Sequence, residues 1–178
     1  MRVETQSHFN SVDLLAHLKQ VALFKVLKEE DKALEHLLKM MTFRQYAAGA
    51  AILKEGAQGS EFFILIEGVA SVIKSTIDAE EYKVAILRAQ DHVFFGEGGL
   101  LDTETRSASV RAESDCRCLV LDRPVFEAFS KQFPHWAYPV LLQLARTIHR
   151  RLGKANNDLI LVHHALVEEV RGGEKLED

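Results

Sequence analysis

The positions of glycine and proline divide this chain into three parts. Seven of the ten glycines lie within residues 49–99, whereas residues 1–48 contain neither glycine nor proline. Glycine and proline mark turns and interrupt regular elements, so a cluster of glycines predicts many short elements joined by turns. Their absence permits long helices, because neither residue is there to weaken them. The chain is therefore expected to fold as short strands in the middle, with helices before and after.

Six short segments rich in β-forming residues occupy the middle part. They are residues 51–53, 62–66, 69–73, 82–87, 108–112 and 118–121. Short strands separated by polar residues or glycines at this spacing are typical of a β-sandwich or barrel. Between the second and third segments, Glu67-Gly68 predicts a hairpin turn, because glycine accepts a positive φ there.

Apolar residues at helical spacing predict two helices before the strands, within residues 14–24 and 33–41. Ser11 or Asp13 is expected to cap the first helix. The charged run of residues 28–32 is expected to open the second.

After the strands, a short helix is expected at 123–129, with Pro124 in its first turn. A long helix then runs from about Pro139 to Arg171, where Gly172-Gly173 stops it.

The long helix carries a regular apolar stripe. Eight apolar residues follow one another at spacings of four and three: Leu141, Ala145, Ile148, Leu152, Ala155, Leu159, Val162 and Leu166. This is the a/d pattern of a coiled coil. The alternative is that the stripe packs on the chain's own barrel. A helix on the order of 48 Å long, at about 1.5 Å per residue, extends past a small barrel. A parallel homodimer through residues 140–167 is therefore favoured.

Composition limits the class of protein. The 178 residues suit one domain with an extension, and the net charge of −4 gives no basic bias that would suggest nucleic-acid binding. No apolar run approaches the ~20 residues of a membrane span, and the first residues lack a secretory pattern. Cys116 and Cys118 are expected to be buried, reduced and inert, which indicates a cytoplasmic protein.

The segment around Glu97 and Arg106 carries the clearest chemistry. Gly96, Gly98 and Gly99 surround Glu97 and allow a ligand to approach the backbone. A helical turn starting near Gly98 would present N–H groups to an anion, and Arg106 suits phosphate oxygens. Glu97 is a good acceptor for a sugar hydroxyl, so the spacing indicates a sugar phosphate or a nucleotide. The alternative is a glycine-rich turn followed by a surface salt bridge between Glu97 and Arg106.

This segment closely resembles the phosphate-binding cassette of cyclic nucleotide-binding domains. The matching residues are Gly96-Glu97 and the run from Arg106 to Ala112, and the resemblance extends over about residues 20–155. It implies a double-stranded β-helix, a jelly-roll-like β-roll with flanking helices, that binds cAMP or cGMP. The implied binding residues are Gly96, Glu97, Gly98, Gly99, Arg106, Ser107 and Ala108.

The resemblance also implies a role for each polar group. Glu97 would take the ribose 2′-hydroxyl, Arg106 and nearby amides the cyclic phosphate, and Ser107 the phosphate or the base. Ser107 favours cAMP over cGMP, because the bacterial cAMP-responsive activators resemble this chain with Arg-Ser. Gly98 departs from the family pattern, which usually has an apolar residue there. A second glycine loosens a short helix by up to ~1 kcal/mol.

These observations predict a sensor protein rather than an enzyme, with no metal and no catalytic residues. Its expected parts are an N-terminal helical segment (1–42), the nucleotide-binding roll (43–123), a hinge helix with the long helix (124–171) and a polar tail (172–178). The expected partners are a cyclic nucleotide, a second copy and a downstream protein, with neither a membrane nor nucleic acid.

Two alternatives remain. One is an interaction or scaffold module with the same fold that binds no nucleotide. The other is the sensor half of a catabolite-activator-type transcription regulator. The second is disfavoured, because only GGEKLED follows Arg171 and cannot form a helix-turn-helix.

Overall fold

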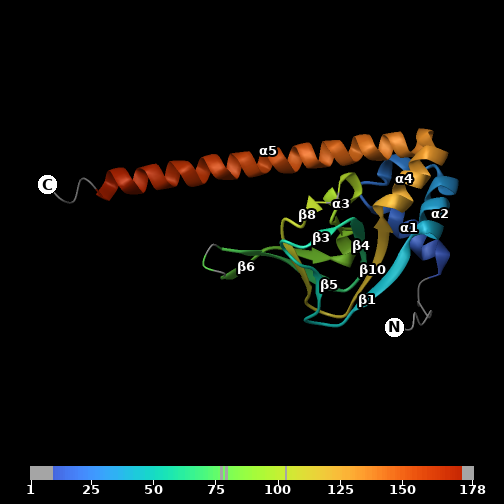
Figure 1. Ribbon diagram of the computed structural model, residues 1–178, viewed down its shortest axis with the longest axis horizontal. Coiled ribbons are helices and arrows are strands. Elements are labelled where there is room, and N and C mark those ends of the chain that lie inside the picture. Colours follow the sequence, from blue (N-terminus) through green and yellow to red (C-terminus); the bar gives the residue numbers. More distant parts are fainter. Residues whose placement is uncertain (1–9, 77, 79, 103, 174–178) are drawn as a thin grey trace. The chain divides into compact units, whose positions relative to one another are not determined.

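The computed structural model describes residues 10–76, 78, 80–102 and 104–173. The chain divides between Val140 and Leu141 into two compact units. The first contains two sheets with flanking helices, and the second is the remainder of the last helix (Figure 1).

Three helical segments precede the strands. They are α1 (Ser11–Gln20), the short 3-10 helix η1 (Lys25–Leu27) and α2 (Asp31–Met40). The prediction that Ser11 or Asp13 caps the first helix is wrong, because the cap is Asn10. The side chain of Asn10 accepts a hydrogen bond from the Asp13 amide at 2.8 Å. Asn10 has the extended backbone that a cap requires, whereas Ser11 and Asp13 already lie inside the helix.

Two four-stranded antiparallel sheets form the body of the first unit. One has the order β1-β10-β4-β7 and the other β2-β9-β5-β6, with a small β3–β8 pair beside them. The strands are β1 (Thr42–Tyr46), β2 (Ala51–Leu53), β3 (Gln58–Gly59), β4 (Glu61–Glu67), β5 (Val69–Ser75), β6 (Glu81–Arg88), β7 (Phe94–Phe95), β8 (Glu104–Thr105), β9 (Ser109–Ala112) and β10 (Cys116–Asp122). The predicted fold, mainly β in a jelly-roll-like roll with flanking helices, is confirmed.

All six predicted strands are present, as β2, β4, β5, β6, β9 and β10. Four further strands were missed. Three of these, β3, β7 and β8, contain only two residues each, too few to show a periodic pattern. The fourth, β1, is rich in polar residues and largely exposed, so it lacks the apolar alternation of a half-buried strand.

Strand β4 is covered on both faces, and all of its residues from Phe62 to Ile66 are buried. On one face, the ring of Phe62 lies 6.1 Å from the ring of Phe24, which follows α1. On the other, the ring of Phe63 stacks on Phe95 at 5.2 Å, inside the core between the sheets. A strand with both faces covered needs a continuous apolar run, which explains why residues 62–66 do not alternate with polar residues.

The turn between β4 and β5 depends on Gly68. Its φ is +90°, and a Cβ there would lie 2.3 Å from the backbone oxygen of Asp115. Both the left-handed backbone and the close approach therefore require glycine, as the hairpin prediction expected.

Both cysteines are buried and free, as predicted. Burial raises the pKa of the Cys118 thiol to about 12, and the neighbouring Cys116 adds to the shift. A thiol with such a raised pKa stays protonated at neutral pH and is a poor nucleophile.

Two helices follow the strands. They are α4 (Arg123–Gln132) and α5 (Pro134–Gly173). The long helix begins at Pro134, five residues before the predicted start at Pro139. Pro134 occupies the first position of the helix, where a missing N–H is tolerated. The carbonyl of Phe133 accepts from the amides of Trp136 and Ala137 at 3.0 Å, so a regular turn precedes Pro139. Pro139 then lies inside the helix.

None of the helices in the described part of the chain is long and apolar enough to cross a membrane.

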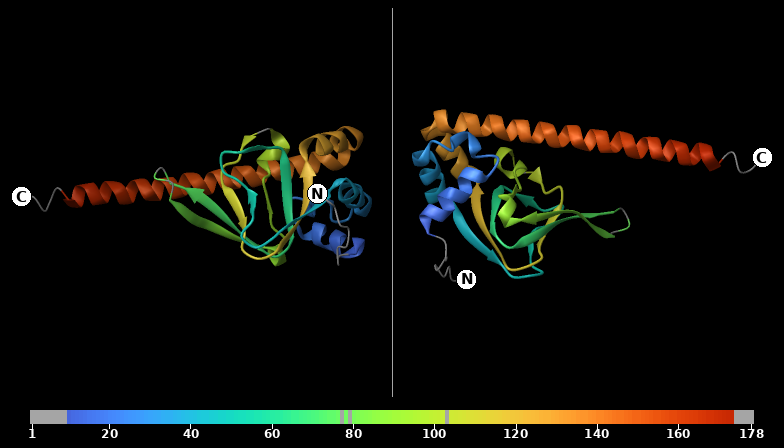
Figure 2. Two further views of the ribbon diagram at one scale, coloured as in Figure 1. Left: turned by 60° about the horizontal axis from the view of Figure 1, so that its bottom comes forward. Right: turned by 180° about the vertical axis from the view of Figure 1, so that it is seen from behind.

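A pair of histidines joins α1 to the segment that leads into β7. The Nδ1 atoms of His17 and His92 lie 3.3 Å apart, and the rings meet edge to face at 4.5 Å. Both views of Figure 2 show the N-terminal helices, in blue, at the side of the sheets. Burial lowers the pKa of His17, and His92 lowers it further, while the backbone of Leu65 acts more weakly in the opposite direction. Two protonated rings would place two N–H donors against each other, so the contact requires at least one neutral ring.

We expect this pair to make the stability of the fold depend on pH. Because the pKa of His17 is lower in the folded state, its contribution is complete above the ordinary imidazole pKa of about 6.5 and decreases as the pH falls below it. Between pH about 7.5 and about 5.5, His17→Gln should lose less unfolding free energy than the parent protein, because the variant lacks the group whose pKa is lowered by folding. Urea titration at each pH measures this difference. The exposed His163→Gln is the control and should behave like the parent.

Candidate functional site

The segment from β7 to β9 contains Arg106 and folds back on the start of β4. The side chain of Arg106 lies between the start of β4 and the turn that follows β7. A short helix, α3 (Gly98–Leu101), follows Gly96 and Glu97, as the sequence predicted. The carbonyls of the two residues before the helix accept from two of its amides: Gly99 N–H donates to Gly96 and Leu100 N–H donates to Glu97, each at 3.1 Å. These two amides are therefore used inside the turn rather than being offered to an anion.

The guanidinium of Arg106 is buried, with only 7% of the residue exposed. Its Nη2 donates to the backbone oxygen of Glu61 at 2.8 Å, and its Nη1 donates to the backbone oxygen of Gly96 at 3.2 Å. The backbone of Arg106 is held as well, because its N–H donates to Ala57 at 2.7 Å and its carbonyl accepts from Gly56 at 3.0 Å. Both ends of the residue are therefore fixed by backbone groups.

Three glycines make room for this side chain. A Cβ on Gly59 would lie 2.7 Å from Nη2 of Arg106. A Cβ on Gly99 would lie 2.9 Å from Nη1, and one on Gly96 would lie 3.1 Å from Nη1. Gly96 also has a φ of +72°. Two of the three, Gly96 and Gly99, were predicted as site residues. In the structure, their lack of a side chain leaves room for the guanidinium of Arg106.

The carboxylate partner of Arg106 is Glu61, which the sequence did not single out. Its Oε2 lies 3.3 Å from Nη2 of Arg106, while its Oε1 accepts from Nη1 of Arg44 at 2.8 Å. Glu61 therefore lies between two arginines. In sequence it is an ordinary polar residue before an apolar strand, and only the packing of β4 against the cassette brings it to Arg106.

The remaining predicted residues lie around this centre. Glu97 and Gly98 are half-buried at the start of α3, Ser107 is exposed, and Ala108 is half-buried just before β9. The structure therefore brings Gly96, Gly99 and Arg106 into direct contact and places the other four beside them in the chain. Their binding role stays a prediction.

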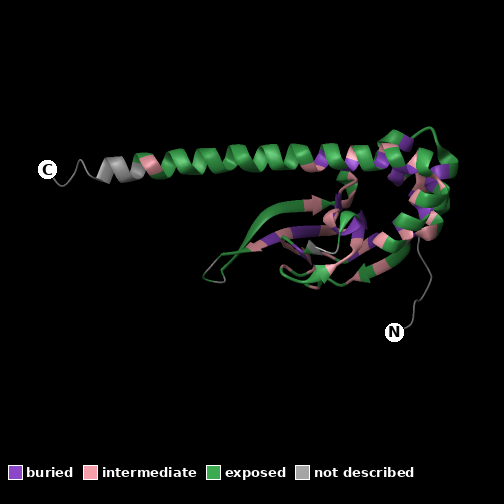
Figure 3. Ribbon diagram, turned by 45° about the horizontal axis from the view of Figure 1, so that its top comes forward, coloured by how far each residue is buried: buried purple, intermediate pink, exposed green. Residues whose placement is uncertain are grey.

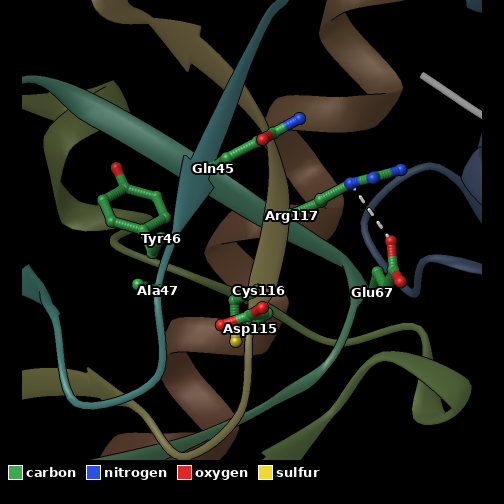
Figure 4. A pocket seen from close by; sticks show the side chains of 7 residues that line it. All are labelled: Gln45, Tyr46, Ala47, Glu67, Asp115, Cys116 and Arg117. Atoms are coloured by element: carbon green, nitrogen blue, oxygen red, sulfur yellow. Dashed lines mark ion pairs between the residues drawn. The ribbon is translucent and has the colours of Figure 1, made fainter. Parts of the chain in front are cut away.

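A separate cavity of about 290 Å³ lies elsewhere in the first unit (Figure 4). It is lined by Gln45, Tyr46, Ala47, Glu67, Asp115, Cys116 and Arg117. Two of these lining residues, Arg117 and Glu67, form an ion pair, with 3.2 Å between Nε and Oε2. None of these lining residues belongs to the cassette, so this cavity is distinct from the predicted nucleotide site. Among the described residues, no three His, Cys, Asp or Glu side chains gather in a way that would hold a metal ion.

Comparison with known proteins agrees with this arrangement. The sequence profile of the cyclic nucleotide-binding domain matches residues 43–133, about half of the chain. The chain belongs to the cyclic nucleotide-binding domain family. The match includes both sheets, the cassette and α4, which makes a regulatory domain the general class of this protein.

Individual relatives share only parts of their length with this chain. Human cGMP-dependent protein kinase 2 is 36% identical over 110 residues, which make up 61% of this chain and 14% of the kinase. The catabolite activator protein of Thermus thermophilus is similar in structure, with a TM-score of 0.68 and 30% identity, covering 79% of this chain and 62% of that one. The N-terminal domain of a transcriptional regulator from Streptomyces coelicolor aligns with a TM-score of 0.66 and 25% identity, covering 79% and 92%.

We expect the glycine at position 99 to be essential for the position of Arg106. A Cβ in Gly99→Ala would meet the Glu61 backbone oxygen at 2.9 Å as well as Nη1 of Arg106, and the backbone oxygen cannot swing away. The variant should lose about 1–3 kcal/mol of unfolding free energy, as overpacked sites do. Urea denaturation measures this loss.

Gly153→Ala is the matched control, because a Cβ there meets nothing within 4 Å and the site is helical. It should be neutral or more stable by up to about 1 kcal/mol. Equal stability of the two alanine variants would contradict the close packing around Arg106.

Proposed function

We propose that this chain is a non-enzymatic sensor of a cyclic nucleotide, cAMP in preference to cGMP, acting in the cytoplasm, where its free thiols stay reduced. Residues 43–123 bind the ligand at Gly96, Glu97, Gly98, Gly99, Arg106, Ser107 and Ala108, and residues 124–171 carry the response. The observation that carries this proposal is the buried guanidinium of Arg106, fixed by the backbone of Glu61 and Gly96.

Arg106 has the chemistry to bind a cyclic phosphate. The three hydrogen bonds to Glu61 and Gly96 hold Nη1 and Nη2 of the guanidinium, which has five N–H donors in all, and we assign one of the remaining donors to the phosphate. The bonds to backbone oxygens hold the plane of the group before the ligand arrives. A preorganised cation loses little freedom on binding, which favours affinity. Glu97, at the start of α3, would accept from the ribose 2′-hydroxyl.

The preference for cAMP rests on Ser107. Arg106-Ser107 resembles the pair in bacterial cAMP-responsive activators, and Ser107 is exposed and so accessible to a ligand. The relative at 36% identity is named a cGMP-dependent kinase, so the affinities of this chain for cAMP and for cGMP must both be measured. Isothermal titration of nucleotide-free protein with each nucleotide decides between them. Heat with neither would reject the sensor and favour the interaction module.

We expect Arg106→Ala to weaken binding of cAMP by about a hundredfold, because the loss of charged hydrogen bonds is worth about 1.5–3 kcal/mol. Titration calorimetry measures the change. Arg106→Lys keeps the charge but loses the planar fork, and should bind at least tenfold more weakly than the parent. Arg111→Ala is the control: Arg111 lies on β9 and pairs with Glu81 at 2.9 Å, so its removal should leave affinity unchanged. Full affinity in both Arg106 variants would exclude this site.

The response would pass from the cassette to α4. Helix α3 contacts α4, and Arg123 at the start of α4 pairs with Asp102 at the end of α3, with 3.3 Å between Nη1 and Oδ1. Ligand bound at α3 would therefore bias the position of α4 and of the helix that follows. Such a shift requires the ligand to bind the two arrangements with different affinity.

We also propose that α5 pairs with a second copy. Every residue from 151 to 166 is exposed, including Leu152 at 57%, Leu159 at 67% and Val162 at 66% (Figure 3). Large apolar side chains at heptad spacing on an exposed helix face fit a coiled-coil seam. The regular spacing through residues 141–166 argues for a partner helix with the same repeat, which a second copy supplies.

The pairing makes a direct prediction for the molecular mass. The parent protein should have twice the 20.1 kDa mass of one chain in multi-angle light scattering. Leu159→Glu should shift it to the monomer, because buried like charges at facing positions repel. Asn157→Glu, outside the seam, should remain a dimer. A monomeric parent protein would contradict the proposed pairing.

A further inference from the structure

An ion pair outside the cassette reaches its central peptide. Lys74, near the end of β5, places its Nζ 3.0 Å from Oε1 of Glu55 and donates a second hydrogen bond to the backbone oxygen of Ser107. The other carboxylate oxygen of Glu55 accepts from the Ser75 amide at 3.0 Å. The carboxylate therefore holds the ammonium group against the Ser107 carbonyl.

The surrounding bonds explain why this contact matters. On one side, Arg106 is fixed by the backbone of Gly56 and Ala57. On the other, pairing of β9 with β5 begins at Ser109 opposite Ile73, and the Ser109 hydroxyl accepts from the Glu55 amide at 2.9 Å. The peptide that joins Ser107 to Ala108 lies between these anchors, before the strand ladder begins, and its carbonyl is held by a side chain.

Because a peptide is planar, the contact at the Ser107 carbonyl also fixes the direction of the Ala108 N–H. A trans peptide is planar, and its C=O and N–H groups point in opposite directions. When the Ser107 carbonyl faces Lys74, the Ala108 amide must face away from Lys74. Lys74 thus sets the direction of the Ala108 N–H, two residues after the buried arginine.

We propose that Lys74 is a positioning residue for the ligand's phosphate: held by Glu55, it turns the Ser107–Ala108 peptide so that the Ala108 amide donates to the phosphate. This inference rests on the proposed function and adds a residue to it that does not touch the ligand. The charge of Lys74 is directed at Glu55 and at a carbonyl. Lys74 therefore acts through the peptide and not as a phosphate ligand.

The pair should persist throughout the neutral pH range. The hydrogen bond from Lys74, and after it the one from the Ser75 amide, lower the pKa of Glu55 below its ordinary value. The carboxylate stays ionised well below neutral pH, so the pair holds Ser107 equally at pH about 6 and about 8. The effect of Lys74 on affinity should then be the same at both pH values.

The experiment replaces the ammonium group and measures how the phosphate is recognised. Lys74→Met keeps the length of the side chain and should weaken cAMP binding about tenfold, the worth of one charge-assisted hydrogen bond. The same protein is titrated with the two phosphorothioate diastereomers of cAMP, in which sulfur replaces one or the other exocyclic oxygen. In the parent protein one diastereomer keeps its oxygen at the Ala108 amide and binds better. In Lys74→Met the ratio between the diastereomers should shrink by a factor similar to the loss of cAMP affinity.

Two further variants complete the test. Lys74→Arg keeps a charged donor and should recover most of the affinity and of the diastereomer ratio. Lys83→Met is the control on the neighbouring strand β6, where Lys83 pairs with Glu113 at 2.7 Å, and should bind like the parent. If Lys74→Met does not fold by circular dichroism, Glu55→Gln carries the test. It leaves Lys74 without its anionic partner and should lower both affinity and ratio.

The outcomes separate this inference from the function on which it rests. Parent-like affinity in Lys74→Met overturns the role of Lys74. A loss of affinity with an unchanged diastereomer ratio also overturns it, because a general structural defect weakens all ligands alike. If the parent protein binds neither nucleotide, or binds cAMP as well without Arg106, the proposed function fails instead.

Discussion

The burial of β4 on both faces is the constraint from which the rest of the first unit follows. Phe62 packs towards the helical layer near Phe24, and Phe63 stacks on Phe95 in the core between the sheets. This anchors the strand from both sides, so its first residue, Glu61, has a fixed position. The backbone oxygen of Glu61 then receives the buried guanidinium of Arg106. The cassette is thus attached to a strand that is packed on both faces, although it consists of turns and a single short helical turn.

The cassette is held in place by backbone groups and small residues more than by side-chain pairs. Arg106 is bonded to the carbonyls of Glu61 and Gly96 through its side chain and to Gly56 and Ala57 through its backbone. The glycines around it leave no space for a Cβ. Such a site excludes water from the cation and leaves its remaining donors directed, which strengthens any interaction with an anion. The Glu55–Lys74 pair adds a side-chain contact to this arrangement, at the carbonyl of Ser107.

Much of the fold could be predicted because its signals are local. The apolar run of β4, the turn glycine Gly68 and the helical pattern of α5 each reflect the conformation of neighbouring residues, and the strand, the turn and the helix are present as expected. The errors were local as well. Asn10 caps α1 in place of Ser11 or Asp13, and α5 starts at Pro134 because a proline is tolerated in the first turn of a helix. Strands of two residues gave no signal, since pairing with a distant strand and not their own composition makes them strands.

The sequence by itself determined the family and the order of the longer elements, and it singled out the segment around Gly96, Glu97 and Arg106, because these depend on residue types at short, regular separations. Only the tertiary structure decided that Arg106 is buried, that Glu61 is its carboxylate partner and that Lys74 reaches the Ser107 carbonyl. Glu61 and Lys74 lie 45 and 33 residues from their partners in the chain. Contacts across such distances arise from the pairing and packing of strands, and no local pattern of residues encodes them.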